Sequence, residues 1–270
     1  MTIKLAVLGN PISHSLSPKL HLAAYHHLDL PWSYSAIQTE ASELSKVLNE
    51  NNLQAASITM PLKEEAFEFS SIRDVAAEAT KTVNTLISTK TGWAGHNTDV
   101  YGIEMALDGI SPSSSLLIGT GATARSAIYA LSNLQNKPRV SIWGRDPQKL
   151  QQSLDFASRL GLNASAAPNL GSGLESADLV ISTVPGQASS EIWQGVDQIP
   201  NKAVLFDIAY SPWPSPAAVV FQGHNVISGL EMLIWQATEQ VRLFCEHFDS
   251  TIRVDNRELY QVMRTSVSSI

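Results

Sequence analysis

The sequence has little cysteine and no long hydrophobic run. Cys245 is the only cysteine among 270 residues, which excludes an intramolecular disulfide and a cysteine-based metal site. No stretch approaches the ~18 uninterrupted apolar residues of a membrane helix. Residues 1–10 are typical of a short strand that runs into a turn at Pro11, not of a signal peptide. We therefore expect a cytoplasmic protein that has no membrane partner.

Positive charge is also scarce. The 18 lysines and arginines stand against 25 aspartates and glutamates, which gives a net charge of −7. This balance argues against nucleic acid or an anionic membrane as a partner. Any anion must therefore be bound locally, by a few cations or main-chain amides. We expect no metal, because His21, His26 and His27 fall in one expected helix without an H-E-x-x-H pattern.

The remaining composition is that of a globular enzyme. Hydrophobic residues make up 44% of the chain and charged residues 16%. A chain of 270 residues suffices for one large domain or two modest ones with a full core. We find no internal repeat and no low-complexity tract.

The stretch Leu116–Ala127, LLIGTGATARSA, organises the rest of the chain. Its pattern predicts a strand, a tight turn and the start of a helix. Gly119 would permit the turn, and Gly121 would let a pyrophosphate approach the main chain, while the helix N-terminus supplies amide donors. Ala124 completes a G-x-G-x-x-A motif, which is a weak signal when it stands alone.

Strands and helices alternate regularly from this stretch onward. Apolar runs recur at Leu116–Ile118, Val140–Trp143, Leu179–Ser182, Val204–Phe206 and Val226–Ile227. This alternation predicts a doubly wound, Rossmann-like parallel sheet. We interpret Ser111–Ser115 as the joint that precedes it.

The first hundred residues predict a separate α/β domain. Its expected strands are Ile3–Leu8, Trp32–Gln38, Ala55–Met60, and a hairpin of Thr82–Ile87 with Trp93–His96. Its first helix is expected to start with Ser17 as N-cap. A last helix, Asn256–Thr265, has no strand to pair with and should fold back onto this domain. We therefore expect an N-terminal α/β substrate domain of residues 1–102 plus 238–270, a nucleotide domain of residues 103–237, and a ligand cleft between them.

Three polar stretches contain candidate binding or catalytic residues. Ser15 and Ser17 could join free helix amides in a neutral pocket for a carboxylate, or the segment could be a plain helix cap. Lys63 follows a strand, at the edge where α/β sheets bind ligands, although a solvated lysine is the simpler interpretation. Asp99 could be a helix N-cap, or a carboxylate that orients the Lys63 ammonium for proton exchange with a substrate hydroxyl. No G-x-S-x-G elbow supports a serine hydrolase.

Taken together in this order, the motifs resemble the shikimate dehydrogenase family over nearly the whole chain. The matching segments are Asn10–Pro18 (N-P-I-x-H-S-x-S-P), Ile58–Lys63 (V-T-x-P-x-K), Val83–Leu86 (V-N-T-L), Asn97–Asp99 (N-T-D), Asp207–Tyr210 (D-x-x-Y) and Gly229–Ala237 (G-x-x-M-L-x-x-Q-A). One such motif means little, whereas six in register are specific.

The resemblance implies a reversible, NADP-linked reduction of 3-dehydroshikimate to shikimate in chorismate and aromatic amino-acid biosynthesis. Lys63, paired with Asp99, would transfer the proton while the cofactor supplies the hydride chemistry. The substrate contacts it implies are Ser15 and Ser17 for the ring carboxylate, with Thr59, Asn84, Tyr210 and Gln236. The cofactor contacts are Gly119, Thr120, Gly121, Ala122, Thr123, Arg145, Lys149, Ile208 and Gly229.

The choice between NADP and NAD depends on the end of the strand Val140–Trp143. NAD sites usually place a carboxylate there for the ribose diol. Here Arg145 and Lys149 follow instead, and two cations suit a 2′-phosphate. Asp146 could approach the ribose hydroxyls, but with Pro147 behind it a helix N-cap is the simpler interpretation. We expect NADP rather than NAD.

The sequence departs from the family pattern in four places. Ser57 stands where Asn is common, His96 where Asp often precedes N-T-D, Ala122 where the loop has Gly, and Ser182–Pro185 where N-A-T-S is usual. Two alternatives therefore stay open: a quinate/shikimate dehydrogenase that uses NAD, and a non-catalytic sensor of a shikimate-like ligand. Retention of both expected catalytic residues argues against the sensor. We expect a monomer or a homodimer.

Overall fold

The computed structural model describes residues 3–184, 186–196, 199–200 and 202–268. The chain forms two compact units, which we call the first unit (Met1–Gly102 with Leu233–Ile270) and the second unit (Ile103–Met232). The boundaries fall within α5 (Thr98–Ala106) and α11 (Gly229–Phe248), so each of these helices has residues in both units.

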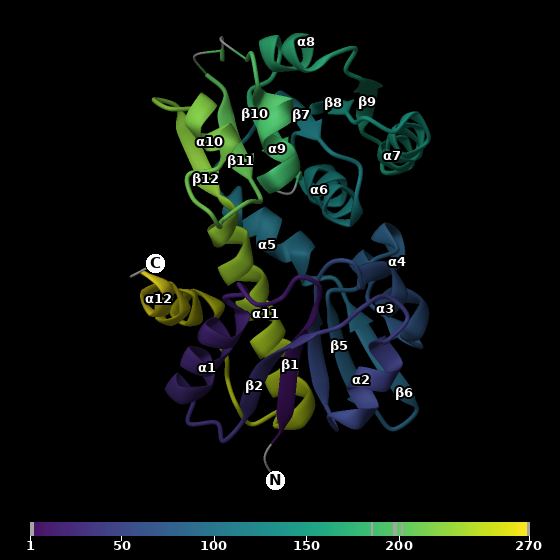
Figure 1. Ribbon diagram of the computed structural model, residues 1–270, viewed down its shortest axis with the longest axis vertical. Helices are drawn as coiled ribbons and strands as arrows, with labels where there is room; N and C mark the ends of the chain where they lie inside the picture. The colour runs from purple at the N-terminus through teal and green to yellow at the C-terminus, as the bar shows by residue number, and fades with distance from the viewer. Residues whose placement is uncertain (1–2, 185, 197–198, 201, 269–270) are drawn as a thin grey trace. The chain divides into compact units, whose positions relative to one another are not determined.

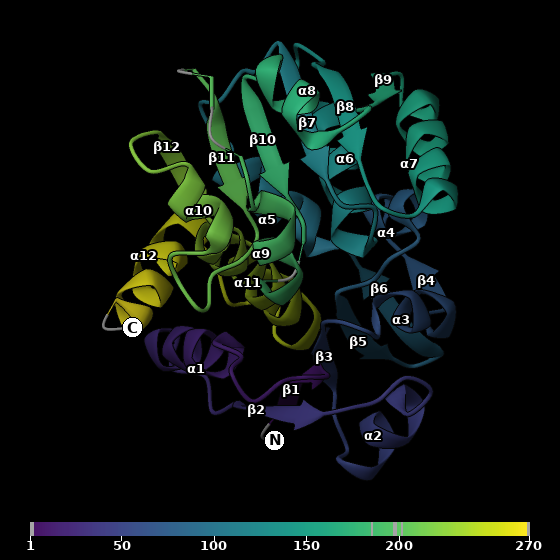
Figure 2. The ribbon, with the colours of Figure 1, turned by 45° about the horizontal axis from the view of Figure 1, so that its top comes forward.

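The first unit contains a six-stranded mixed sheet in the order β2-β1-β3-β5-β6-β4 (its strands are labelled in Figure 2). Strand β1 pairs in parallel with β2 and β3, whereas β5 pairs antiparallel with β3 and β6. The elements of this unit, besides its parts of α5 and α11, are β1 (Lys4–Gly9), α1 (Ser17–His27), β2 (Ser33–Gln38), α2 (Leu44–Glu50), β3 (Ala55–Ile58), α3 (Lys63–Phe69), β4 (Ile72–Arg73), α4 (Val75–Thr80), β5 (Thr85–Thr89), β6 (Gly92–His96) and α12 (Asn256–Val267).

The C-terminal helix α12 packs against α1, and the two lie side by side in both views (Figures 1 and 2). Leu259, Met263 and Val267 repeat every four residues along α12 and are buried, so one face of this otherwise polar helix is apolar. The predicted return of the last helix to the first unit is confirmed.

The second unit contains a six-stranded, all-parallel sheet in the order β12-β11-β10-β7-β8-β9. This arrangement confirms the predicted doubly wound sheet. Besides its parts of α5 and α11, its elements are β7 (Ser114–Ile118), α6 (Ala122–Asn133), β8 (Arg139–Trp143), α7 (Pro147–Arg159), β9 (Asn163–Ala166), α8 (Leu170–Glu175), β10 (Leu179–Ser182), α9 (Gly186–Trp193), β11 (Val204–Asp207), α10 (Pro216–Val220) and β12 (Asn225–Ser228).

Strands β7 and β10 flank the point where the strand order of this sheet reverses. From β7 the chain proceeds through β8 to β9, and from β10 it proceeds the other way to β12. Every residue of β7 and β10 is buried, as expected for central strands covered on both faces. In sheets of this kind, the carboxyl ends of the strands at the reversal point form a ligand crevice. The glycine-rich loop predicted from the sequence directly follows β7.

Some local predictions were wrong. Ser17 does not cap α1: the N-cap is Leu16 without a side-chain bond, and the Ser17 amide donates to Ser15 Oγ at 3.3 Å. The hydroxyl of Ser15 accepts this amide because Ser15 precedes Ser17, the first residue of the helix, by two positions. Residues 114 and 115, expected in a joint, begin β7 because pairing with β8 and β10 overrides their polar character. Two short edge strands, β4 and β9, escaped prediction because neither carries an apolar run.

No helix in the described ranges has the length and apolar character needed to span a bilayer.

Candidate active site

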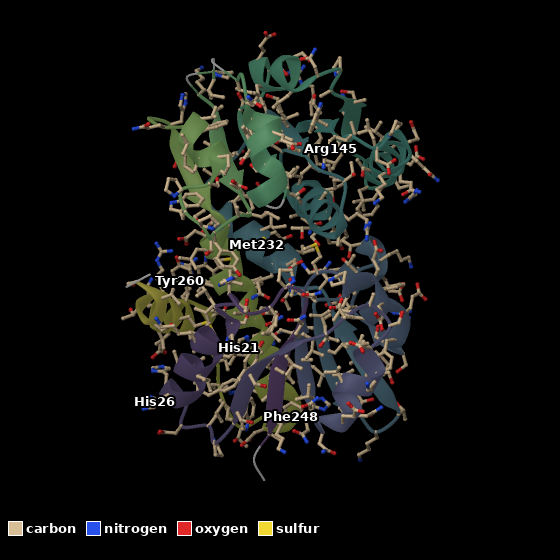
Figure 3. The ribbon with its side chains drawn as sticks, in the orientation of Figure 1. His21, His26, Arg145, Met232, Phe248 and Tyr260 are labelled. Atoms are coloured by element: carbon tan, nitrogen blue, oxygen red, sulfur yellow. The ribbon has the colours of Figure 1, made fainter. Side chains whose placement is uncertain are left out.

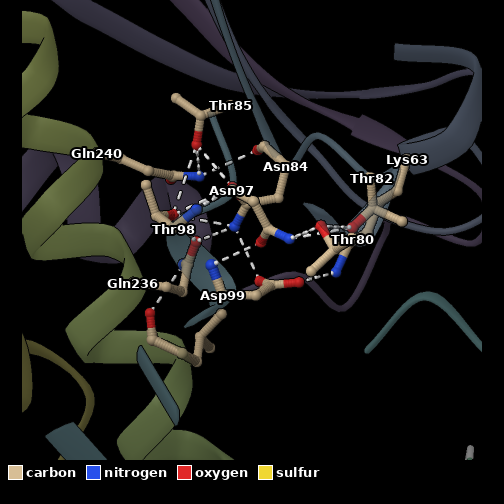
Figure 4. Close-up of polar contacts among 11 residues, drawn as sticks. Lys63, Thr80, Thr82, Asn84, Thr85, Asn97, Thr98, Asp99, Gln236 and Gln240 are labelled. Atoms are coloured by element: carbon tan, nitrogen blue, oxygen red, sulfur yellow. Dashed lines mark hydrogen bonds and ion pairs between the residues drawn. The ribbon is translucent and has the colours of Figure 1, made fainter. Parts of the chain in front are cut away.

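Lys63 and Asp99 form a close ion pair in the first unit. Lys63 Nζ donates to Asp99 Oδ2 at 2.5 Å, and the two side chains are only 13% and 6% exposed (Figure 4). Lys63 is the first residue of α3, and Asp99 lies in the first turn of α5. Because both groups are largely withdrawn from water, their attraction is screened far less than that of a surface pair.

The alternative role for Asp99, a helix N-cap, is excluded by its neighbours. The main-chain amide of Asp99 donates to Asn97 Oδ1 at 3.2 Å, so Asn97 provides the capping oxygen. Asn97 is held in turn because its Nδ2 donates to Thr80 Oγ1 at 2.8 Å and to Thr82 Oγ1 at 3.0 Å. The carboxylate of Asp99 is therefore left for Lys63 on one oxygen and for a second donor on the other.

Asn84 is that second donor. Its Nδ2 donates to Asp99 Oδ1 at 2.8 Å, and its Oδ1 accepts from the Thr98 amide at 2.8 Å (Figure 4). A main-chain amide can only donate, so this contact fixes which end of the Asn84 side chain is oxygen. The Asp99 carboxylate is thus held from both sides by donors.

Gln236 of α11 joins the same cluster. Its Oε1 lies 3.3 Å from Asn84 Nδ2 and 3.5 Å from Thr98 Oγ1, while its Nε2 donates to the Leu233 carbonyl at 2.8 Å. Four of the residues predicted from sequence, Lys63, Asn84, Asp99 and Gln236, are therefore brought together from four segments of the chain.

Ser15 and Thr59 follow two neighbouring strands of the first sheet. Strands β1 and β3 are parallel partners, so the loops after them leave the same edge. The Thr59 amide donates to the Leu8 carbonyl at 2.9 Å. A Cβ at Gly9 would overlap Thr59 Cγ2, so glycine permits these loops to touch. No hydrogen bond among the described residues joins the side chains of Ser15, Ser17 or Thr59 to the Lys63–Asp99 pair.

The loop after β7 in the second unit has the form of an anion cradle. Gly119 has φ +110°, and a Cβ there would overlap Thr183 Oγ1, so only glycine fits. A Cβ at Gly121, by contrast, would meet nothing within 4 Å. Helix α6 begins at Ala122, and its N-cap Gly121 makes no side-chain capping bond, so no cap side chain satisfies the first amides of the helix.

Arg145 and Lys149 are exposed residues that follow β8 in the second unit (Figure 3 labels Arg145). Arg145 lies in the loop after β8, and Lys149 lies in the first turn of α7. The loop after β8 lies against the loop after β7, because a Cβ at Gly144 would come within 2.7 Å of Thr120 Cγ2. Asp146 Oδ1 accepts from the amides of Gln148 at 2.9 Å and Lys149 at 3.1 Å. Asp146 is therefore the N-cap of α7, which is the simpler of the two roles considered for it.

Ile208 and Gly229 lie side by side at the carboxyl ends of β11 and β12. The Gly229 amide donates to the Ala209 carbonyl at 3.2 Å, and a Cβ at Gly229 would overlap the Ile208 carbonyl oxygen. Tyr210 also lies in the second unit, whereas the other expected substrate residues lie in the first. It is half-buried, and burial raises the pKa of its hydroxyl.

Two polar residues near these sites were given no role in the sequence analysis. Asp207 is fully buried, burial raises the pKa of its carboxyl, and it anchors the loop that carries Tyr210 by accepting from Ser215 Oγ at 2.5 Å and from the Ala209 amide at 3.2 Å. Gln240 donates to Thr85 Oγ1 at 2.9 Å. Gln240 lies one helical turn after Gln236, so the sequence could have predicted that the two residues share one face of the helix.

The described residues contain no group of three His, Cys, Asp or Glu side chains that could hold a metal ion.

Comparison with known proteins identifies the family. Residues 7–86 match the model of the shikimate dehydrogenase substrate binding domain, and residues 95–213 match that of the alanine dehydrogenase/PNT C-terminal domain. A shikimate dehydrogenase (NADP(+)) of Prochlorococcus marinus subsp. pastoris is 31% identical over 256 residues, which cover 88% of this chain and 90% of that protein. The chain belongs to the shikimate dehydrogenase family.

Solved structures of the shikimate dehydrogenase family share the fold over almost the full length. Shikimate dehydrogenase from Mycobacterium tuberculosis has a TM-score of 0.82 at 34% identity and covers 97% of this chain and 99% of its own. Shikimate 5-dehydrogenase from Thermus thermophilus, in complex with NADP(H) and shikimate, has a TM-score of 0.80 at 28% identity, with 98% and 100% covered.

Proposed function

We propose that this protein is an NADP-dependent shikimate dehydrogenase, which interconverts 3-dehydroshikimate and shikimate in aromatic amino-acid biosynthesis. The observation that carries the proposal is the buried Lys63–Asp99 pair, held by Asn84, in a chain that belongs to this family. A lysine ammonium fixed by a carboxylate is suited to give a proton to a carbonyl oxygen as that oxygen gains negative charge.

The chain's own residues would handle the proton as follows. In the reducing direction, Lys63 Nζ donates a proton to the forming alkoxide and becomes a neutral amine, which is recharged from solvent through its 13% exposed surface. Asp99 Oδ2 keeps the nitrogen directed, while Asn84 occupies Asp99 Oδ1 and prevents the carboxylate from turning. In the oxidising direction, the neutral amine takes the hydroxyl proton.

The substrate's carboxylate would be bound at the start of α1. Ser15 Oγ accepts from the Ser17 amide, which leaves the hydroxyl hydrogen of Ser15 to donate to an anion. Together with the Ser17 hydroxyl, this supplies two neutral donors near a helix N-terminus. Thr59, Asn84, Tyr210 and Gln236 would contact the ring or its hydroxyls.

The residues of the second unit fit NADP. The open space at Gly121 and the uncapped amides of α6 suit a pyrophosphate, with Thr120, Ala122 and Thr123 lining the loop. Arg145 and Lys149 suit a 2′-phosphate, whereas the Asp146 carboxylate, the candidate for a ribose diol, is held by one of its oxygens as the cap of α7. Ile208 and Gly229 would line the nicotinamide end. When bound, NADPH supplies the hydride.

The test is nicotinamide absorbance after the purified protein is mixed with shikimate or quinate, each with NADP or NAD. Activity confined to shikimate with NADP supports the proposal. Comparable or better rates with quinate and NAD would make the protein a quinate/shikimate dehydrogenase. Binding of shikimate without any absorbance change would make it a sensor.

Location and assembly are further proposals, namely a cytoplasmic enzyme that is a monomer or a homodimer. Light scattering of the purified protein at several concentrations decides the assembly, and an assembly larger than a dimer contradicts it.

A further inference from the structure

The first unit contains a second polar cluster, which is connected to the Lys63–Asp99 pair through Asn84. It consists of Tyr25 and His21 on α1, Tyr34 on β2, Ser57 on β3 and Gln240 on α11, and we call it the rear cluster. All five residues are at most 6% exposed. Figure 3 labels His21, which projects from α1 toward α11.

Gln240 is the centre of the rear cluster, and its amide orientation is fixed. Its Nε2 donates to the Asn84 carbonyl at 3.1 Å and to Thr85 Oγ1 at 2.9 Å. A main-chain carbonyl only accepts, so the nitrogen of the Gln240 amide must face it. Gln240 Oε1 therefore faces the other way, toward Ser57 Oγ at 2.7 Å and His21 Nε2 at 3.2 Å.

This orientation fixes the proton on His21. An amide oxygen only accepts, so His21 Nε2 carries the hydrogen and Nδ1, 3.2 Å from the Tyr25 hydroxyl, is the acceptor. Burial lowers the pKa of His21 to about 3, against a smaller opposing effect of its bond to Gln240, so the ring is neutral at physiological pH. The Tyr34 hydroxyl donates to Ser57 Oγ at 2.6 Å, which leaves the Ser57 hydrogen for Gln240.

One series of hydrogen bonds leads from Gln240 to Asp99. Gln240 donates to Thr85 Oγ1, Thr85 Oγ1 donates to Asn84 Oδ1 at 2.9 Å, and Asn84 Nδ2 donates to Asp99 Oδ1 (Figure 4). Hydrogen bonds in such a series strengthen one another, so we expect loss of a donor at one end to weaken the bonds further along it.

We propose that His21 is a positioning residue for the proton-transfer reaction: its Nε2–H bond to Gln240 Oε1 keeps the Gln240 side chain in place, so that Gln240 Nε2 continues to hold Thr85 and, through it, Asn84 and the Asp99 carboxylate that directs Lys63. The inference rests on the proposed function of the Lys63–Asp99 pair. His21 touches neither of those residues, so it acts only through Gln240.

His21 also packs against Tyr34, and the experiment must separate this packing role from hydrogen-bond donation to Gln240. Its ring stacks on Tyr34 with centroids 4.0 Å apart and 9° between planes. His21→Phe keeps an aromatic ring in this stack and removes both nitrogens. His21→Gln loses the ring and keeps an N–H near the position of Nε2. The two variants therefore separate packing from donation.

The experiment measures kcat and KM for shikimate with NADP, together with the thermal midpoint of each variant. In His21→Phe we expect kcat to fall about tenfold, equivalent to about 1.4 kcal/mol, while KM changes much less. In His21→Gln we expect kcat to recover to near the wild-type value. In a Gln240→Leu background, His21→Phe should lower kcat no further, because residues that act through one bond are not additive. His21→Asn, whose amide is too short to reach Gln240, repeats the expected loss of kcat should His21→Phe not fold.

A matched control and a reference variant make the result decisive. Leu20→Val changes a buried residue of the same helix and removes no hydrogen-bonding group, so it should lower the thermal midpoint and leave kcat unchanged. No turnover by the wild type overturns the proposed function together with this inference. This inference alone is overturned if Lys63→Ala abolishes turnover while His21→Phe leaves kcat within about twofold of the wild type. It is also overturned if His21→Phe lowers kcat in the Gln240→Leu background by as much as it does in the wild type.

Discussion

At the scale of single residues, short local spacings predicted which charged side chains lie in the candidate active site. Lys63 and Asp99 were expected as a pair, and the structure places Lys63 Nζ against Asp99 Oδ2. What decides between an active carboxylate and a helix cap is Asn97, whose Oδ1 takes the Asp99 amide. Neighbouring side chains of the same motif thus divide the two tasks between them.

Replacing Lys63 by alanine should lower kcat by roughly 10²–10⁴, the usual contribution of general acid–base assistance. Shikimate binding should change much less, because the carboxylate site that we propose lies at the start of α1 and does not include Lys63. Steady-state kinetics with NADP, together with shikimate titration, checks this. Lys46→Ala, which removes an exposed lysine of α2, is the control. Near-normal turnover in Lys63→Ala would remove Lys63 from its role.

Replacing Arg145 by alanine should weaken NADP binding by roughly 10- to 100-fold, the range expected for loss of a charged hydrogen bond of about 1.5–3 kcal/mol. NAD binding should hardly change, because NAD lacks the 2′-phosphate. Fluorescence titration with both cofactors measures this. Arg159→Ala, at the opposite end of α7, controls for the loss of one positive charge. An equal fall in both affinities would show that Arg145 does not contact the 2′-phosphate.

At the scale of elements, helix α7 illustrates a motif with two possible meanings. Asp146 and Pro147 follow β8 where a ribose carboxylate would stand, and the same pair is a common helix start. The structure favours the cap, since Asp146 Oδ1 accepts two amides of the first turn.

Asp146→Ala should therefore lower the free energy of unfolding by about 1 kcal/mol, the typical value for loss of an N-cap. The ratio of NADP to NAD affinity should stay the same. Urea unfolding and cofactor titration measure the two quantities. Asp155→Ala, in the middle of α7, removes one carboxylate without uncapping the helix and should cost only a few tenths of a kcal/mol. A selective loss of NAD affinity in Asp146→Ala would identify a ribose ligand instead.

At the scale of the whole molecule, the first unit depends on groups that are buried in one protonation state. His21 is fully buried, and burial lowers its pKa from 6.5 to about 3. The folded state therefore binds a proton at His21 less readily than the unfolded state does. The stability that neutral His21 contributes is present above pH 6.5 and is lost as the pH falls from 6.5 toward 3.

The difference in unfolding free energy between the wild type and His21→Phe should consequently shrink by about 1.4 kcal/mol per pH unit below pH 6.5. Urea unfolding at several pH values between 7.5 and 4.5, set by this window, measures it. Carboxyl groups titrate in both proteins and cancel in the difference. For Leu20→Val, which removes no titrating group, the difference should not depend on pH, and a flat difference for His21→Phe would contradict the assignment.

The sequence alone determined most features that depend on short spacing, the N-cap of α1 being an exception. The β7–α6 loop with Gly119 and Gly121, the alternation of strands and helices in the second unit, and the Lys63 and Asp99 motifs each arise within a dozen residues. In those windows hydrophobic period, glycine backbone freedom and helix-start chemistry act locally. The short edge strands β4 and β9 were not predicted, since only pairing with a neighbouring strand makes them strands.

The tertiary structure alone decided which of these groups act together. Gln236 and Gln240 lie more than 150 residues from Asn84 and meet it because α11 packs back onto the first unit. The orientation of the Asn84 amide and the proton on His21 follow from donors and acceptors on different strands and helices. Such contacts depend on burial, since only away from water must each polar group find its partner within the protein. For this chain, short spacing therefore predicted the candidate reacting groups, and long-range packing set their geometry.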